Sequence, residues 1–200
     1  MVVVKLWYRF TGALLKALYR VIYGRSIRWG KALHFRKGLQ LTAELGGTIT
    51  IGDNVFFNNG CAVHAIEEIR IGDGTIFGEN VRIYDHNHRF VNADESIKGQ
   101  GYSTAPVVIG KHCWIGSNVT IIKGASIGDN CVIGAGCVID SPIPSDTVVR
   151  LEQRLIKEEV RHARAFPVAR IGTRHGYGPW WCRNHDDELP SSFRPRAGHL

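Results

Sequence analysis

The sequence predicts an all-β solenoid, a parallel β-helix of hexapeptide repeats, and two observations support this fold. Corner-forming residues recur between apolar ones, as in "IGDN" at 51–54 and again at 127–130, and such residues tolerate tight turns. A period of six residues is the signature of a parallel β-helix. Isoleucine occupies every sixth position of one stretch, at Ile109, Ile115, Ile121, Ile127, Ile133 and Ile139.

The period of six predicts which residues touch. Three hexads close one coil of about 18 residues, and successive coils stack at strand spacing, about 4.8 Å. We therefore expect Ile109 beside Ile127, and Cys113 beside Cys131, in ladders along the interior. The solenoid is expected over residues 33–149. Its upstream frame reads Leu33, Leu39, Leu45, Ile51, Phe57 and Val63, and after a shift of two residues Ile71, Phe77 and Ile83.

The cysteines indicate a reducing compartment. They are odd in number and include no CxxC pair, so reduced thiols fit better than a disulfide framework. Small inward-facing core residues are a simpler interpretation than metal ligands or nucleophiles. No apolar run reaches the roughly 18 residues of a spanning helix, and no secretory signal is recognisable. We expect a cytoplasmic protein. The cysteines are Cys61, Cys113, Cys131, Cys137 and Cys182.

The excess positive charge behind the net charge of +7 lies in residues 1–43, which include the basic N-terminal segment, residues 1–32. Residues 1–43 hold nine Lys or Arg and no acid, whereas residues 44–200 hold 16 basic and 18 acidic residues. The spacing predicts an amphipathic helix with a basic stripe. The stripe consists of Lys5, Arg9, Lys16 and Arg20, and the apolar positions include Trp7, Leu14 and Leu18.

Two interpretations of this helix stay open. Its apolar side can cover the end of the coil while the cations face water. Alternatively, the basic stripe binds an anionic membrane surface, with peripheral contact through residues 1–28 at the inner face of the cell membrane. No nucleic-acid-binding motif accompanies the charge, so no nucleic acid partner is expected.

The stretch "IYDHNHRF" at 83–90 marks an interruption of the repeat. The next Ile-led hexad begins at residue 109, which predicts a loop over residues 89–108. Loops of that length within a regular fold are usually functional. The coil would hold His88 at the root of this loop. A neutral imidazole there can take the proton of a hydroxyl nucleophile, which is chemistry suited to acyl transfer.

Two long stretches carry a family resemblance. "VVIGKHCWIGSNVTIIKGASIGDNCVIGAGCVI" at 107–139 and "IGDGTIFGENVRIYDHNHRF" at 71–90 resemble the hexapeptide-repeat acyltransferases of the galactoside, maltose and streptogramin acetyltransferase type. The resemblance extends to enzymes that acetylate polysaccharide or lipopolysaccharide. It implies a left-handed parallel β-helix, assembly as a homotrimer, active sites between subunits and acetyl-CoA as the acyl donor.

The resemblance also implies roles for single residues. His88 falls on the family's general base, Asn58 on an asparagine that hydrogen-bonds the acceptor, and His86 is placed to orient His88 or contact the acceptor. A second set lines the acetyl-CoA cleft, with the Ser117 backbone N–H as a donor to the developing oxyanion. That set is Trp114, Ser117, Gly134 and Ala135.

The C-terminal part departs from the repeat. "RLEQRLIKEEVRHA" at 150–163 predicts a short helix, which we place over residues 150–164. Residues 165–200 have no periodicity and many helix and strand breakers, so they are expected to form a tail without regular structure.

The sequence as a whole predicts an O-acetyltransferase that uses acetyl-CoA and a carbohydrate hydroxyl. The basic N-terminus favours a lipid-linked glycan acceptor in surface polysaccharide or lipopolysaccharide biosynthesis. One alternative is a zinc enzyme of the carbonic anhydrase type, with His64, His88 and His112 as ligands from different subunits. Another is a trimeric scaffold without catalytic activity.

Overall fold

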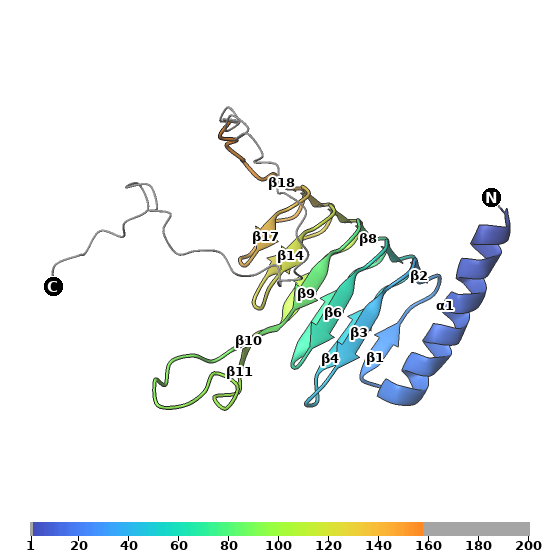
Figure 1. Cartoon of the computed structure of the whole chain (residues 1–200). Coiled ribbons are helices and arrows are strands. Elements are labelled where there is room, and N and C mark those ends of the chain that lie inside the picture. Colours follow the sequence, from blue (N-terminus) through green and yellow to red (C-terminus); the bar gives the residue numbers. More distant parts are fainter. Residues whose placement is uncertain (1, 158–200) are drawn as a thin grey trace, which may run out of the picture. The chain divides into compact units, whose positions relative to one another are not determined.

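The computed structural model describes residues 2–157, with side chains from residue 11 onwards. One helix, α1 (Val2–Tyr23), precedes a stack of β-coils (Figure 1). The coils begin at Ile27, ahead of the predicted start at Leu33. Within the described residues, no helix qualifies as a candidate membrane span.

Each complete coil contributes one strand to each of three parallel sheets, which form the faces of the stack (Figure 1). The first sheet consists of β1 (Ile27–Trp29), β4 (Thr48–Ile51), β7 (Glu68–Ile71), β12 (Val107–Ile109) and β15 (Ser126–Ile127). The second consists of β2 (His34–Phe35), β5 (Phe56–Phe57), β8 (Ile76–Phe77), β13 (Trp114–Ile115), β16 (Val132–Ile133) and β18 (Val148–Val149). The third consists of β3 (Gln40–Ala43), β6 (Ala62–Ala65), β9 (Arg82–Tyr84), β14 (Thr120–Ile121) and β17 (Val138–Ile139).

The predicted isoleucine ladders are confirmed. Ile109 pairs with Ile127 in the first sheet. Ile115 pairs with Ile133 in the second sheet. All four are buried. Ile121 pairs with Ile139 in the third sheet in the same way. Because a central isoleucine such as Ile115 is packed by the coils on both sides of it, replacing it with Ala is expected to cost about 2–5 kcal/mol.

The first coils are longer than the three hexads of a regular coil. Ile27 pairs with Ile49, and Ile49 pairs with Ile69, so both steps exceed the step from Ile109 to Ile127. The prediction that Leu45 faces the interior is therefore wrong: its side chain is 75% exposed, in a turn where its φ is 51°. Every extension falls between the third sheet and the first, at residues 44–47, 66–67 and 85–106.

The two "IGDN" corners adopt the backbone that their sequence predicts. Asn54 and Asn130 have φ values of 56° and 57°. This left-handed conformation favours Asn and Gly over branched residues. The corner residues themselves therefore determine the turns. The apolar residues of each strand point into the interior between these turns.

Helix α1 packs on the first coil through a side that carries Lys16 and Tyr19, which contradicts the first interpretation, an apolar side on the coil with the cations in water. The Lys16 Nζ donates a hydrogen bond to the Leu33 carbonyl, and the Arg20 guanidinium lies 5.3 Å from the centre of the Trp29 ring. Tyr19 Oη donates a hydrogen bond to the Leu39 carbonyl and accepts one from the Leu41 N–H, at the start of β3. Burial lowers the pKa of Lys16, and the neighbouring Arg20 charge adds to this.

The apolar side of α1 faces outward instead. Leu14 and Leu18 are 66% and 50% exposed, so they do not cover the coil as the first of the two interpretations expected. Lys5, Arg9 and Trp7 belong to the same helix, but their side chains lie outside the described part.

The short helix predicted over residues 150–164 does not begin within the described residues. Residues 150–157 are in neither helix nor strand, and the rest of the predicted helix lies outside the described part. The predicted tail, residues 165–200, also lies outside it.

Candidate functional site

The interruption of the repeat is an antiparallel β-ribbon that leaves the stack of coils (Figure 1). Its strands are β10 (His86–His88) and β11 (Tyr102–Thr104). Residues 85–106 lie outside the repeat, so this excursion starts earlier than the predicted loop, residues 89–108, and also ends earlier. Val107 is already buried in the core. His88 lies opposite Tyr102 within the ribbon, and not at the edge of the coil as predicted.

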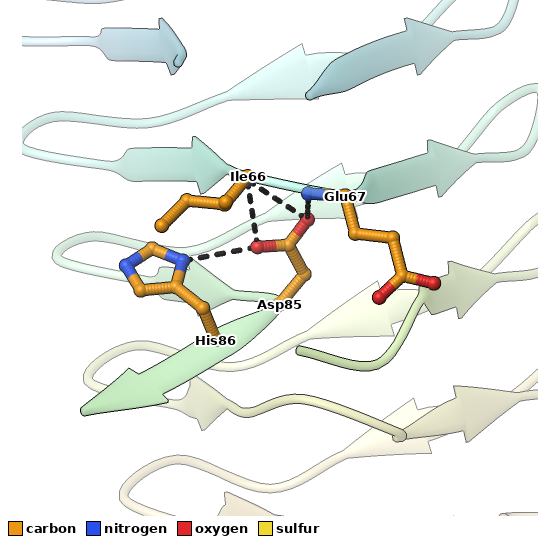
Figure 2. A network of polar contacts seen from close by, with 4 residues as sticks. All are labelled: Ile66, Glu67, Asp85 and His86. Carbon is orange, nitrogen blue, oxygen red and sulfur yellow. Dashed lines mark hydrogen bonds and ion pairs between the residues drawn. The ribbon is translucent and has the colours of Figure 1, made fainter. Parts of the chain in front are cut away.

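A buried carboxylate stands at the root of the ribbon. Asp85 is fully buried and accepts hydrogen bonds from the backbone N–H groups of Ile66 and Glu67, the latter at 2.8 Å. Its Oδ1 lies 3.0 Å from His86 Nδ1. Figure 2 shows Asp85 between the histidine ring and the corner of the preceding coil. The carboxylate thus ties that corner to the first residue of the ribbon.

Aromatic rings connect the coil to the ribbon. His64 stacks on Tyr84, with ring centroids 5.5 Å apart, and Tyr84 meets His86 edge to face. Tyr102 then lies between the two predicted site histidines, 5.5 Å from His86 and 4.7 Å from His88. Burial lowers the pKa of His64, and the nearby His86 lowers it further. His64 therefore favours the neutral form. The ring contacts run without a break from His64 on the coil to His88 on the ribbon.

The returning strand is held to the coil as well. Lys123 Nζ donates to Ser103 Oγ at 2.6 Å, and the Ala105 N–H donates to the Asp85 carbonyl at 2.9 Å. Contacts at both strands leave little freedom at the root. A positioned catalytic group depends on such support, because small misplacements cost rate.

The other predicted site residues gather at a different corner, between the second and third sheets. Asn58 follows β5, Ser117 follows β13, and Gly134 and Ala135 follow β16. Trp114 lies on β13 with its side chain 56% exposed.

The coils approach closely at this corner. A Cβ on Gly116 would lie 2.6 Å from the Ala135 backbone nitrogen, so only glycine fits there. Ser117 Oγ accepts a hydrogen bond from the Glu79 N–H, and Asn58 Oδ1 accepts one from Arg36. Ala135 is exposed on the coil next to that of Trp114. Within one chain, Trp114, Ser117, Gly134 and Ala135 lie on two adjacent coils, whereas Asn58 lies at the same corner two coils away from Trp114. None of these residues lies with His86 and His88.

The thiols are core residues, as predicted. Cys61, Cys113, Cys131 and Cys137 are buried and free, while Cys182 lies outside the described part. Burial raises the pKa of the Cys61 and Cys113 thiols, which disfavours the thiolate that a nucleophile or metal ligand requires.

The three histidines of the zinc alternative lie on separate elements. His64 is on β6, His88 on the ribbon, and His112 at a corner with φ of 55°. Among residues 11–157, no group of three or more His, Cys, Asp or Glu could hold a metal ion within one chain. That alternative draws its ligands from different subunits, so metal analysis of the purified protein is the measurement that decides it.

Sequence reasoning missed Asp85, Tyr84 and Tyr102. One signal was present for Asp85, which stands two residues after the inward-facing Ile83. Side chains in a strand alternate between faces, so an acid at that position is expected to point inward. A buried carboxylate needs partners, and it is therefore a candidate for a structural or functional role.

Comparisons with known proteins give the relationship. A family model described as the hexapeptide repeat of succinyl-transferase matches residues 106–141. WbbJ of Escherichia coli K12, named a lipopolysaccharide biosynthesis O-acetyl transferase, is 34% identical over 131 residues, covering 62% of this chain and 67% of WbbJ. A galactoside O-acetyltransferase of the same organism is 36% identical over 114 residues, and that match covers 56% of this chain and 55% of the enzyme.

A solved structure agrees with these relatives. A hexapeptide-repeat acetyltransferase from Vibrio cholerae, complexed with acetyl coenzyme A, matches with a TM-score of 0.55 at 28% identity. The match covers 68% of this chain and 71% of that protein. The repeat, the three-sheet coil and the sequence identity to WbbJ all indicate the same family. The chain belongs to the hexapeptide-repeat acetyltransferase family.

Proposed function

We propose that this protein transfers the acetyl group of acetyl-CoA to a carbohydrate hydroxyl, with His88 as general base. The observation that carries the proposal is the ribbon, which holds His88 against Tyr102 at the one long excursion of the described coils. The acetyl-CoA complex of the related Vibrio cholerae enzyme supports the choice of donor.

The chemistry needs one proton acceptor near a poor nucleophile. A sugar hydroxyl attacks the thioester carbonyl while the neutral imidazole of His88 takes its proton, and the same imidazole returns the proton to the departing thiolate. The Ser117 backbone N–H is the proposed donor to the oxyanion that forms on the carbonyl oxygen. Asn58 and His86 are the proposed contacts of the acceptor.

The donor and acceptor residues belong to two subunits in this proposal. His86 and His88 lie at the corner between the third and first sheets, while Trp114, Ser117 and Ala135 lie at the next corner. A homotrimer would bring the ribbon of one chain to the cleft of another. The excursion carries exposed apolar side chains suited to such contact, namely Phe90, Val91 and Ile97.

The acceptor we propose is a glycan of a surface polysaccharide or lipopolysaccharide, in lipid-linked form, at the inner face of the cell membrane. The name of WbbJ and the concentration of positive charge in residues 1–43 support this choice. Free buried thiols support a cytoplasmic location.

One experiment tests the function directly. Surface glycans of cells with and without the protein are compared by mass spectrometry, and cells carrying only His88→Ala form the control. We expect an acetyl group that disappears with the protein and is not restored by the variant. Unchanged glycan acetylation, together with purified protein that neither binds nor hydrolyses acetyl-CoA, would favour the scaffold alternative.

A further inference from the structure

The outward face of α1 is apolar where a surface helix normally shows polar residues. Leu14, Leu18, Val21 and Ile22 follow the spacing of one helix face and are 66%, 50%, 84% and 59% exposed. The polar residues of the same helix are used to hold it on the coil, Lys16 at the Leu33 carbonyl among them. This orientation leaves the apolar face available to an outside partner.

A groove lies beside this face. It measures about 430 Å³ and combines apolar side chains with two cationic residues, Arg36 and Lys37. Arg36 and Lys37 are both exposed, and Arg36 Nη1 also donates to Asn58 Oδ1 at 3.3 Å. The apolar lining consists of Leu14, Leu15, Leu18 and Phe35. An apolar groove with cations at its edge suits an acyl chain next to an anionic headgroup.

The charge around the face restricts the partner. Arg25, Arg28 and Lys31 are exposed in the segment that follows α1, and residues 1–43 contain no acid. A second copy would bring the same positive charge to this face, and like charges disfavour that pairing. Residues 158–200 hold seven Arg and five acidic residues, so they supply no acidic complement either.

We propose that this end of the molecule docks on an anionic lipid bilayer. The apolar face of α1 enters the interface and the surrounding cations pair with lipid phosphates. The helix is not apolar enough to span a membrane, which fits a helix lying in the plane of the interface. The docking does not depend on the acetyl transfer proposed above, and it would hold the ribbon and the coils near a lipid-linked acceptor.

Vesicle co-sedimentation of the full chain tests the docking. Phosphatidylglycerol-containing vesicles are compared with pure phosphatidylcholine vesicles at low and high salt. The Val21→Gln/Ile22→Gln double variant is expected to lose at least about tenfold in affinity for the anionic vesicles, because it removes exposed apolar surface only. A matched double variant, Val148→Gln/Leu151→Gln, changes two exposed apolar residues at the other end of the coils and should bind normally.

A charge variant tests the electrostatic part of the docking, the pairing of cations with lipid phosphates. Arg28→Gln/Lys37→Gln should weaken binding at low salt by roughly thirty-fold, since each charge near the surface contributes about 1 kcal/mol. The same variant should bind anionic vesicles at high salt nearly as well as the native protein does. Acetyl-CoA hydrolysis in the absence of lipid should be unchanged in all these variants, which keeps this test separate from that of the proposed function.

Three results would overturn the proposal. One is an absence of lipid-bound native protein at low salt, and another is equal binding to both kinds of vesicle. The third is self-association that the Val21→Gln/Ile22→Gln variant abolishes while vesicle binding is absent, which would assign the face to a second copy of the chain.

Discussion

The Asp85 carboxylate lies 3.0 Å from His86 Nδ1 and is completely buried. It also accepts hydrogen bonds from two backbone N–H groups of the preceding coil. A carboxylate at Nδ1 favours the tautomer with its proton there, which leaves Nε2 of His86 as an acceptor. The ribbon therefore begins with a histidine of defined orientation.

Replacing Asp85 should destabilise the protein. Asp85→Ala removes the buried acceptor of the Ile66 and Glu67 N–H groups, and a lost hydrogen bond to a charged group typically costs about 1.5–3 kcal/mol. We expect the free energy of unfolding in urea to fall by about 2–4 kcal/mol. Asp94→Ala, which changes an exposed acid of the same excursion, should change it by less than about 0.5 kcal/mol. Equal stability of the two variants would show that the buried contacts are not needed.

Replacing His88 should slow the chemical step without loosening the donor. His88→Ala removes the proposed base and is expected to lower turnover by about 100-fold or more. The dissociation constant of acetyl-CoA, measured by calorimetry, should stay the same because the donor residues lie at another corner of the chain. His34→Ala removes an exposed histidine of β2 and is the control. Near-normal turnover of the His88→Ala enzyme would remove this residue from the role of base.

Enlarging Ala135 should weaken donor binding. Ala135→Leu places a bulky side chain on the proposed donor surface, one coil from Trp114 and Ser117. An obstructed contact of this kind typically costs about 1–3 kcal/mol, so acetyl-CoA affinity should fall by about tenfold or more. Val138→Leu, at an exposed position nearby in the chain, is the matched control. If calorimetry gives the same affinity for both variants, the donor cleft lies elsewhere.

Acidification should destabilise the fold through His64. Its pKa is lowered from 6.5, chiefly by burial and further by the charge of His86. As pH falls below about 6.5, the unfolded chain takes up a proton that the folded protein still resists, so the stabilisation present above this pH is lost. The midpoint of thermal unfolding should drop between about pH 7 and pH 5. His64→Asn should reduce this drop and His34→Asn should not. A pH dependence unaffected by His64→Asn would contradict the assignment.

The proposed trimer is open to a direct mass measurement. Light scattering should give about 67 kDa, three times the 22.3 kDa of one chain. Replacing Phe90, Val91 and Ile97 with Ser should favour smaller species, since these exposed apolar residues are the proposed contact of the excursion. A native protein that stays at the mass of one chain would exclude an active site shared between subunits.

The interior was predictable because its contacts repeat. Ile109 and Ile127 are three hexads apart in the sequence and neighbours in the structure, and a periodic sequence states this relation directly. The same reasoning failed at Leu45, which happens to continue the period of six. The number of residues in that coil depends on the length of the corner at residues 44–47, which is longer than a regular corner. The spacing of the apolar residues does not reveal this extra length.

The site was predictable only in part. The interruption after Ile83 located His86 and His88, but the pairing of β10 with β11 joins residues across a long loop and has no periodic signal. The orientation of α1 was also hidden. Both faces of that helix can bury surface, and the hydrogen bonds of Lys16 and Tyr19 to the coil decide which one does.

All three long connections lie along a single edge of the stack, between the third and first sheets. At that edge the chain gains either a slightly longer turn or a whole ribbon while the ladders keep their register, as the pairs Ile49–Ile69, Ile27–Ile49 and Ile69–Val107 show. New segments grafted there should leave the interior undisturbed, whereas a single insertion within a strand would turn its side chains to the wrong face. This edge is thus the place where a protein of this kind can acquire a different acceptor specificity without having to build a new core.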